Sequence, residues 1–303
     1  MSIAIMFADY GLPEVLQPVH VDQPEPAAGQ IRVAVRAAGV QPFDCTLRRG
    51  DLAQWMPLSL PSCLGNELAG TVEAIGAGVT AVAVGDEILG WQERACYAEE
   101  VLVEAEQVVA KPAGMPWEHA GVLSASGQTA HTAIEALGIA AGDTLLIHAA
   151  AGGVGSFALQ IAVALGATVI GTASPANHDY LRTLGSLPVT YGDGLEDRVR
   201  AASAQQVTAV LDCIGGPALE QSLNLVNNPA RIVTIADRVN ATRLGIGVTG
   251  TDRSPHRLSQ VVDLYEQDRL QVHIHRAVPL LDAPIAHRQV ETGHVRGKVV
   301  LIR

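Results

Sequence analysis

The stretch that decides the fold is TLLIHAAAGGVG, residues 144–155, in which an apolar run ends at a turn of small residues. Gly152, Gly153 and Gly155 lie in this turn, and SFALQIAVALG follows with apolar residues at helical spacing. Such a turn suits a dinucleotide pyrophosphate, because the backbone can approach the anion and helix N-terminal N–H groups face it. A side chain at Gly152 would hold the phosphates away, and one at Gly155 would push the helix off the sheet.

The glycine pattern by itself is a weak indication, because Ala150 stands at its first position. Its context strengthens it: ATVIGTAS, residues 167–174, follows the helix as a second strand and completes a βαβ unit. We therefore predict that a dinucleotide binds at Ala151, Gly152, Gly153, Val154 and Gly155.

The end of the second strand bears on the choice of cofactor. An NAD site usually carries Asp or Glu about 20 residues after the glycines, bound to the ribose 2′-hydroxyl. Here no acid appears before Asp179, whereas Ser174 can donate to a 2′-phosphate, and His178 and Arg182 can add positive charge. This favours NADPH over NAD. The alternative is that Ser174 only caps the next helix and that the site takes either cofactor.

Composition excludes several classes of protein. The chain has 303 residues, enough for two domains, and 48% are hydrophobic. A net charge of −11 without any basic run argues against a nucleic-acid surface or an anionic-membrane partner. The four cysteines form no C-x-x-C pair, so neither a disulfide framework nor a zinc knuckle is indicated. Neither a signal peptide nor a membrane span is evident, and we expect a cytoplasmic protein.

The periodicity of the chain changes along its length. Residues 1–117 contain short alternating runs separated by turns, which predicts a compact, partly open barrel. Residues 118–265 alternate strands with helices, which predicts a doubly wound parallel sheet of the Rossmann type and an α/β fold class. The tail, from about 266 to 303, is expected to return to the first domain and complete it.

Several motifs occur in an order typical of one family. They are GLPEVL (11–16), GVQPFDCTLRRG (39–50), LPSCLGNELAG (60–70), SGQTAHTA (126–133), VLDCIGG (210–216) and GHVRGKVVL (293–301). With the glycine turn, they make the chain resemble, over essentially its full length, the zinc-free quinone oxidoreductase branch of the medium-chain dehydrogenase/reductase superfamily. The resemblance implies a GroES-like β-barrel domain beside the Rossmann domain, and a homodimer.

The resemblance also implies that no metal is bound. In zinc-dependent alcohol dehydrogenases of this superfamily, three segments supply the catalytic ligands, and their positions here hold Gln41, Asn66 and Ala125. None of these is a good zinc ligand, and the four-cysteine lobe that binds structural zinc is missing. Without a Lewis acid the site suits quinones and activated enones, whose conjugated carbonyl spreads the developing negative charge.

The family motifs assign roles to further residues. Gln41 is expected to donate its amide to the substrate carbonyl or the nicotinamide ribose, and Thr129 to bond the nicotinamide or its ribose. Cofactor contacts are expected at the ends of later strands and in the last strand, at Tyr191, Ile214, Ile235 and Lys298. Lys298 could reach either the cofactor or the substrate, and the alternative is a strand-edge lysine near the dimer or domain interface. We interpret Asp44 as a residue that supports its turn, with a proton donor as the alternative. Glu67 is also interpreted as a turn-supporting residue, with orientation of the active site as the alternative.

One departure concerns the substrate end of the pocket. Related quinone oxidoreductases often carry a Tyr shortly after this Asp, but here Asp44 is followed by Cys45 and Thr46. The sequence thus predicts a zinc-independent, NADPH-dependent oxidoreductase that passes hydride to a quinone or other conjugated carbonyl compound. The alternatives are an enone or enoyl reductase of a specialised pathway and, with less support, a non-catalytic NADPH-binding protein.

Overall fold

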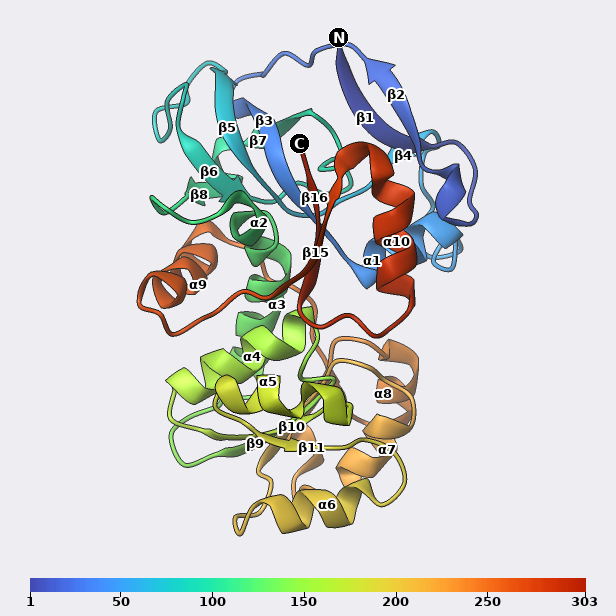
Figure 1. The fold of residues 1–303 in the computed structure, drawn as a ribbon, viewed down its shortest axis with the longest axis vertical. Coiled ribbons are helices and arrows are strands. Elements are labelled where there is room, and N and C mark those ends of the chain that lie inside the picture. The colour runs from blue at the N-terminus through green and yellow to red at the C-terminus, as the bar shows by residue number, and fades with distance from the viewer. The chain divides into compact units, whose positions relative to one another are not determined.

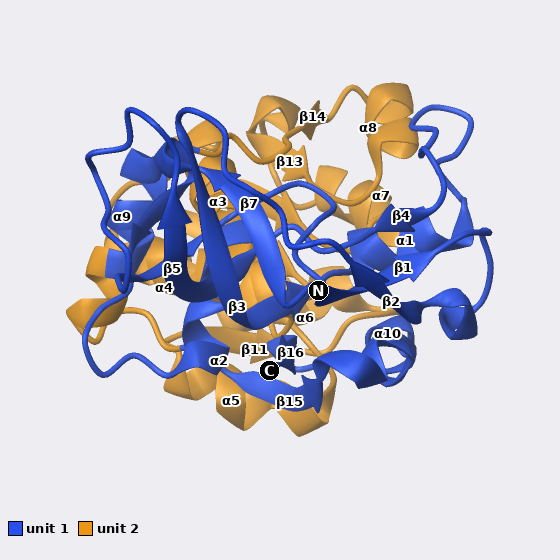
Figure 2. Ribbon diagram, turned by 90° about the horizontal axis from the view of Figure 1, so that it is seen from above, with its two compact units in different colours: residues 1–125, 254–262, 272–303 blue, residues 126–253, 263–271 orange.

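The computed structural model describes residues 1–303, which form two compact units (Figure 2). Unit 1 comprises Met1–Ala125, Ser254–Val262 and Val272–Arg303, and unit 2 comprises Ser126–Arg253 and Asp263–Gln271. The chain therefore passes from unit 1 to unit 2, returns to unit 1 for residues 254–262, and after residues 263–271 of unit 2 ends in unit 1. No helix in either unit combines the length and the apolar character needed to cross a bilayer.

Unit 1 is built on a seven-stranded sheet whose longest strand is β3 (Gln30–Val40). Along the sheet the order is β15-β16-β3-β5-β6-β8, and β7 also pairs with β3. The C-terminal strand β16 runs antiparallel to β3, so the last residues of the chain belong to the main sheet of unit 1 (Figure 1). The other strands are β5 (Leu68–Ile75), β6 (Glu87–Gly90), β7 (Glu100–Glu104), β8 (Val108–Ala110), β15 (Ile274–Pro279) and β16 (Lys298–Ile302).

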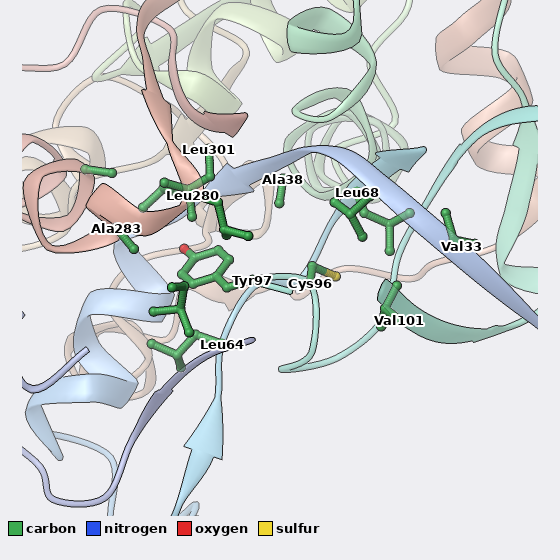
Figure 3. Close-up of a cluster of buried hydrophobic side chains, with 14 of the residues drawn as sticks. Val33, Ala38, Leu64, Leu68, Cys96, Tyr97, Val101, Leu280, Ala283 and Leu301 are labelled. Atoms are coloured by element: carbon green, nitrogen blue, oxygen red, sulfur yellow. The ribbon is translucent and has the colours of Figure 1, made fainter. Parts of the chain in front are cut away.

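A smaller sheet and several helices complete this unit. The sheet has the order β2-β1-β4, formed by β1 (Ser2–Phe7), β2 (Gln17–Val21) and β4 (Ser62–Cys63). The helices are α1 (Pro42–Arg49), α2 (Trp117–Ala120) and α10 (Ala283–Glu291), while α9 (Pro255–Glu266) begins here and ends in unit 2. One buried cluster joins residues of β3, β5, β7, β16 and α10 around Tyr97 (Figure 3). Its continuity explains how strands far apart in the sequence share one core.

Unit 2 contains a six-stranded sheet of order β11-β10-β9-β12-β13-β14, in which every pair is parallel. In chain order, β10 and β11 are added on one side of β9, and β12, β13 and β14 are then added on the other. The strand order therefore reverses between β9 and β12, as in a doubly wound fold. This confirms the predicted fold class. The strands are β9 (Thr144–His148), β10 (Thr168–Thr172), β11 (Leu187–Val189), β12 (Ala209–Asp212), β13 (Ile232–Thr234) and β14 (Gly247–Val248).

Helices connect these parallel strands, because a parallel pair needs a crossover. They are α4 (Gly153–Ala164), α5 (His178–Thr183), α6 (Leu195–Ala202), α7 (Pro217–Leu223) and α8 (Arg238–Leu244), and α3 (Leu123–Ala136) precedes the first strand. Gly166 ends the first crossover helix with a φ of +86°, a conformation that glycine adopts without strain. The helix that follows the glycine turn thus ends where the sequence predicts.

Asp44 anchors α1 to the rest of unit 1. Its fully buried carboxylate accepts hydrogen bonds from the backbone N–H of Gln41 at 2.9 Å, the amide of Asn66 at 2.8 Å and the hydroxyl of Tyr97 at 3.0 Å. A further N–H, from Gly65, lies at 3.3 Å. The interpretation of Asp44 as a structural residue agrees with these contacts. Burial nevertheless raises the pKa of Asp44 to about 6, although the hydrogen bonds oppose the shift.

This shift predicts a pH-dependent stability that Asp44→Asn removes. The folded chain holds a proton on Asp44 up to a pH of about 6, whereas the ordinary pKa is 3.8, so this group's contribution to stability is lost as pH rises through that window. The difference between the free energy of unfolding of the wild type and that of Asp44→Asn should therefore decrease as the pH is raised from about 4 to about 7. Urea denaturation measures it, with the exposed Asp9→Asn as the matched control. A difference that rises with pH would contradict the assignment.

Candidate functional site

The turn between β9 and α4 is held close to the neighbouring strand. Ala149 adopts a φ of +54°, a left-handed conformation that costs an alanine roughly 1 kcal/mol. Its N–H donates to the hydroxyl of Thr172 at 3.1 Å, and the N–H of Ala150 donates to the carbonyl of Thr172 at 3.0 Å. These bonds tie the turn to the end of β10 and fix the path of the backbone into the helix.

Two glycines in this turn are required for different reasons. A Cβ at Gly155 would lie 2.4 Å from the carbonyl oxygen of Ala149 and 2.9 Å from the Cα of Ala150. Both are backbone atoms, so a side chain there would force the helix away from the turn, whereas the sequence analysis expected the helix to move off the sheet. A Cβ at Gly152 would meet only the carbonyl oxygen of Ala149, at 3.3 Å, and would otherwise project into open space. Gly152 is the N-cap of α4 and provides no side-chain cap, so the helix start can receive an anion.

The remaining sequence-predicted cofactor residues of unit 2 follow the carboxyl ends of adjacent strands. Because the strands are parallel, these ends lie at one edge of the sheet, next to the glycine turn. Tyr191 and Ile214 are 55% and 63% exposed there, which is typical of side chains that lie over a ligand rather than in the core. The structure therefore brings together Ser174 and His178 after β10, Tyr191 after β11, Ile214 after β12 and Ile235 after β13.

Ser174 makes no capping bond to the short turn Pro175–Asn177 that follows it. Its oxygen only receives a long hydrogen bond, 3.4 Å, from the amide of Asn177, so its own proton is available to a ligand. His178 lies 3.5 Å from the hydroxyl of Thr190. Arg182 pairs with Asp179 at 2.6 Å, so its charge is already partly neutralised.

Arg198 is a residue of this region that sequence reasoning missed. Its guanidinium donates to four consecutive carbonyl oxygens of the loop after β11, those of Thr190 (2.8 Å), Tyr191 (3.2 Å), Gly192 (3.1 Å) and Asp193 (2.8 Å). These bonds fix the loop that carries Tyr191 and place a positive charge beneath it. No local pattern marks this role, because the arginine lies in α6 and looks like an ordinary surface residue of a helix.

The loops after β12 and β13 are held by two carboxylates that the sequence analysis also left without a role. Buried Asp212 accepts from the N–H of Ile214 at 3.1 Å and from the hydroxyl of Thr234 at 2.5 Å. Asp237 accepts from the N–H of Gly216 at 3.0 Å and caps α8. The loop that carries Ile214 is therefore fixed before any ligand binds.

Two further polar side chains of unit 2 are Thr129, which the sequence assigns to the nicotinamide or its ribose, and His148. Thr129 lies in α3, and its hydroxyl is 2.5 Å from that of Thr251. His148, at the end of β9, is buried and bonds the hydroxyl of Ser222 at 2.9 Å rather than the backbone. Burial lowers the pKa of His148 to about 4, so the imidazole is neutral at physiological pH.

In unit 1 the central polar feature is the carboxylate of Glu67, which is fully buried. One of its oxygens accepts from the side-chain amide of Gln41 and, at 2.9 Å, from the ammonium of Lys298. The other accepts from the backbone N–H of Ala125 at 2.6 Å. The interpretation of Glu67 as a turn-supporting residue is wrong, because its partners come from three distant segments. Lys298, expected at the cofactor, is 3% exposed and directs its ammonium to Glu67.

The three positions that the resemblance matches to zinc ligands all make hydrogen bonds to buried carboxylates. Gln41 and the backbone of Ala125 bond Glu67, and the amide of Asn66 bonds Asp44. Nowhere in the structure do three or more His, Cys, Asp or Glu side chains form a group that could hold a metal ion.

Sequence comparison finds relatives for the whole chain. Residues 27–124 match the family described as the alcohol dehydrogenase GroES-like domain, and residues 188–301 match the family described as zinc-binding dehydrogenase. The quinone oxidoreductase of Pseudomonas aeruginosa is 29% identical, with all of both chains covered. The polyketide synthase GfsB of Streptomyces halstedii is 33% identical over 90% of this chain. This chain spans only 5% of that synthase.

Solved structures share the fold over the full length. The quinone oxidoreductase of Coxiella burnetii is 33% identical with a TM-score of 0.90, covering 100% of this chain and 99% of that one. The Escherichia coli quinone oxidoreductase complexed with NADPH is 28% identical with a TM-score of 0.89, covering 99% and 100%. The CurK enoyl reductase is 26% identical with a TM-score of 0.88, covering 99% of each chain.

The GroES-like match over residues 27–124 agrees with the sheet of unit 1, and the TM-score of 0.90 over the full length agrees with the folds of both units. The chain belongs to the quinone oxidoreductase branch of the medium-chain dehydrogenase/reductase superfamily.

Proposed function

We propose that this chain is a zinc-independent, NADPH-dependent oxidoreductase that transfers hydride to a quinone or another conjugated carbonyl compound. The observation that carries the proposal is the turn from Ala149 to Gly155, where the backbone enters α4 without a side-chain cap and Gly152 leaves the approach open. The Escherichia coli relative, whose structure holds NADPH, supports the choice of cofactor.

The residues at the carboxyl edge of the sheet in unit 2 fit this dinucleotide. Ala151–Gly155 would hold the pyrophosphate through backbone N–H groups, and Ser174 and His178 would bind the 2′-phosphate. Tyr191, Ile214 and Ile235 would cover the adenosine and nicotinamide ends. When bound, NADPH supplies the hydride; the chain's own task is to bind and orient the reactants and to exclude water.

Two residues are proposed to bind the reacting groups: Gln41 the acceptor, and Thr129 the nicotinamide or its ribose. One amide N–H of Gln41 is bonded to Glu67, which leaves its second N–H for the acceptor oxygen. A donor of this kind stabilises negative charge that develops on a conjugated carbonyl. The hydroxyl of Thr129, within reach of Thr251, would bond the nicotinamide or its ribose.

A second candidate is an enone or enoyl reductase that acts on a carbon–carbon double bond of a specialised substrate. The matches to a polyketide synthase and to the CurK enoyl reductase favour it. Both candidates use the same cofactor edge, because reduction of an activated double bond also places negative charge on a conjugated oxygen. They differ only in the acceptor.

The two glycines of the turn predict separable effects. Gly155→Ala should lower the free energy of unfolding by about 1–3 kcal/mol, because its Cβ meets backbone atoms. Gly152→Ala should leave stability nearly unchanged but raise the NADPH dissociation constant about tenfold or more. Urea denaturation and fluorescence titration measure the two effects. Equal NADPH binding by Gly152→Ala and wild type would remove the pyrophosphate from this turn.

Ser174→Asp tests the 2′-phosphate assignment. A carboxylate at this position repels a 2′-phosphate and accepts from a 2′-hydroxyl, so NADPH binding should weaken far more than NADH binding. Ser174→Ala, the matched control, should weaken NADPH binding only about tenfold, the effect of one hydrogen bond to a charged group. Dissociation constants for both cofactors measure the difference, and an equal loss for NADPH and NADH in Ser174→Asp would exclude the assignment.

The activity itself is tested by following oxidation of NADPH with benzoquinone, phenanthrenequinone and a simple α,β-unsaturated ketone as acceptors. Turnover with the quinones, unchanged after chelator treatment, is the expected result. Turnover with the enone alone would support the second candidate. Tight NADPH binding without turnover of any acceptor would count against both.

A further inference from the structure

Glu67 and Lys298 form an ion pair that is almost completely removed from water. Glu67 is fully buried and the side chain of Lys298 is 3% exposed, with 2.9 Å between the ammonium and the carboxylate. Such a pair contributes little net stability, because desolvation of both charges opposes their attraction. Its presence beside a residue assigned to the acceptor therefore calls for another explanation.

The pair determines how the side chain of Gln41 is oriented. A carboxylate accepts hydrogen bonds and cannot donate them, so the amide nitrogen of Gln41, not its oxygen, must face Glu67. The backbone N–H of Gln41 is held as well, by Asp44 at 2.9 Å. The backbone N–H and the side-chain amide of Gln41 are therefore both held. This determines the directions in which the second side-chain N–H and the side-chain carbonyl point.

The carboxylate of Glu67 is closely surrounded. Gly39 in β3 lies against it so closely that a Cβ there would come within 2.1 Å of its carboxylate oxygen and 2.7 Å of Cδ. Gly39 has no positive φ, so this close approach explains the glycine better than backbone conformation does. The N–H of Ala125 holds the second oxygen at 2.6 Å. The carboxylate that orients Gln41 is therefore confined on several sides.

We propose that Glu67 and Lys298 are positioning residues for the acceptor: together they hold the amide of Gln41 in the one orientation that directs its second N–H to the acceptor oxygen. This inference rests on the proposed function, which assigns Gln41 to the acceptor. A donor already fixed before reaction stabilises the developing oxyanion without reorganisation. The proposed positioning role assigns Lys298 to the acceptor rather than to the cofactor.

Three variants separate orientation from charge. Glu67→Gln keeps the shape but can both donate and accept, so Gln41 loses its single orientation. Lys298→Met removes the ammonium, and the double variant Glu67→Gln/Lys298→Met leaves no unpaired buried charge and serves where Lys298→Met does not fold. Lys111→Met is the matched control, because Lys111 is 5% exposed and pairs with Glu87 at 2.8 Å elsewhere in unit 1.

The first readout is the side-chain amide resonance of Gln41 in nitrogen-15 spectra of the whole chain, assigned by its loss in Gln41→Glu. It should shift in all three variants and stay in place in Lys111→Met. The second readout is kinetic: kcat with the best quinone or enone should fall about 10- to 100-fold, the effect of misplacing one reacting group. The NADPH dissociation constant should change less than about threefold, and Lys298→Arg should recover part of kcat.

Failure of this inference is distinguishable from failure of the proposed function. An unmoved Gln41 resonance in Glu67→Gln, or an unchanged kcat in every variant, would overturn the positioning role in an active enzyme. A large increase in the NADPH dissociation constant of Lys298→Met with an unmoved resonance would assign Lys298 to the cofactor instead. An inactive wild type would refute the proposed function, and the resonance would still show whether the pair orients Gln41.

Discussion

The carboxylate of Glu67 is the constraint on which unit 1 depends. A buried charge must find donors, and this one finds them on segments that the chain reaches at widely separated points: Gln41, Ala125 and Lys298. Lys298 begins β16, the strand that pairs with β3, while Gly39 in β3 makes room for the carboxylate. The return of the C-terminal tail to the first domain and the placement of Gln41 before α1 are therefore linked through one side chain.

Unit 2 has the opposite requirement, because a site for an anion needs backbone N–H groups that no other group of the chain has already bonded. After β12 and β13 the chain's own carboxylates take the backbone N–H groups, with Asp212 and Asp237 as acceptors. At the start of α4 no side chain does so. The starts of α5, α6 and α7 also lack a side-chain cap. What distinguishes the start of α4 is the glycine turn before it, where Gly152 leaves the approach to the helix open.

The sequence predicted what depends on local chemistry and missed what depends on distant contacts. The role of Gly155 and the alternation of strands and helices in unit 2 could be inferred, because each follows from a few consecutive residues. The pairing of Lys298 with Glu67 could not be inferred, because 231 positions separate the two residues and no local sequence pattern around either one predicts the contact. The same holds for Arg198, whose helix resembles any solvated helix, and for Gly39, whose requirement for glycine is steric rather than conformational.

Under the proposed function, the residues that the resemblance matches to the ligand positions of zinc enzymes would account for a preference for conjugated acceptors. A metal polarises a carbonyl with a full positive charge, whereas the amide of Gln41 offers one hydrogen bond. In unit 1 the ammonium of Lys298 is paired with the carboxylate of Glu67. Under the proposed function this pair would direct one N–H of Gln41 at the acceptor and would supply no charge to it. One directed donor would suffice for an acceptor that spreads its negative charge over a conjugated system, so the proposed preference for such acceptors would follow from the side chains at these positions.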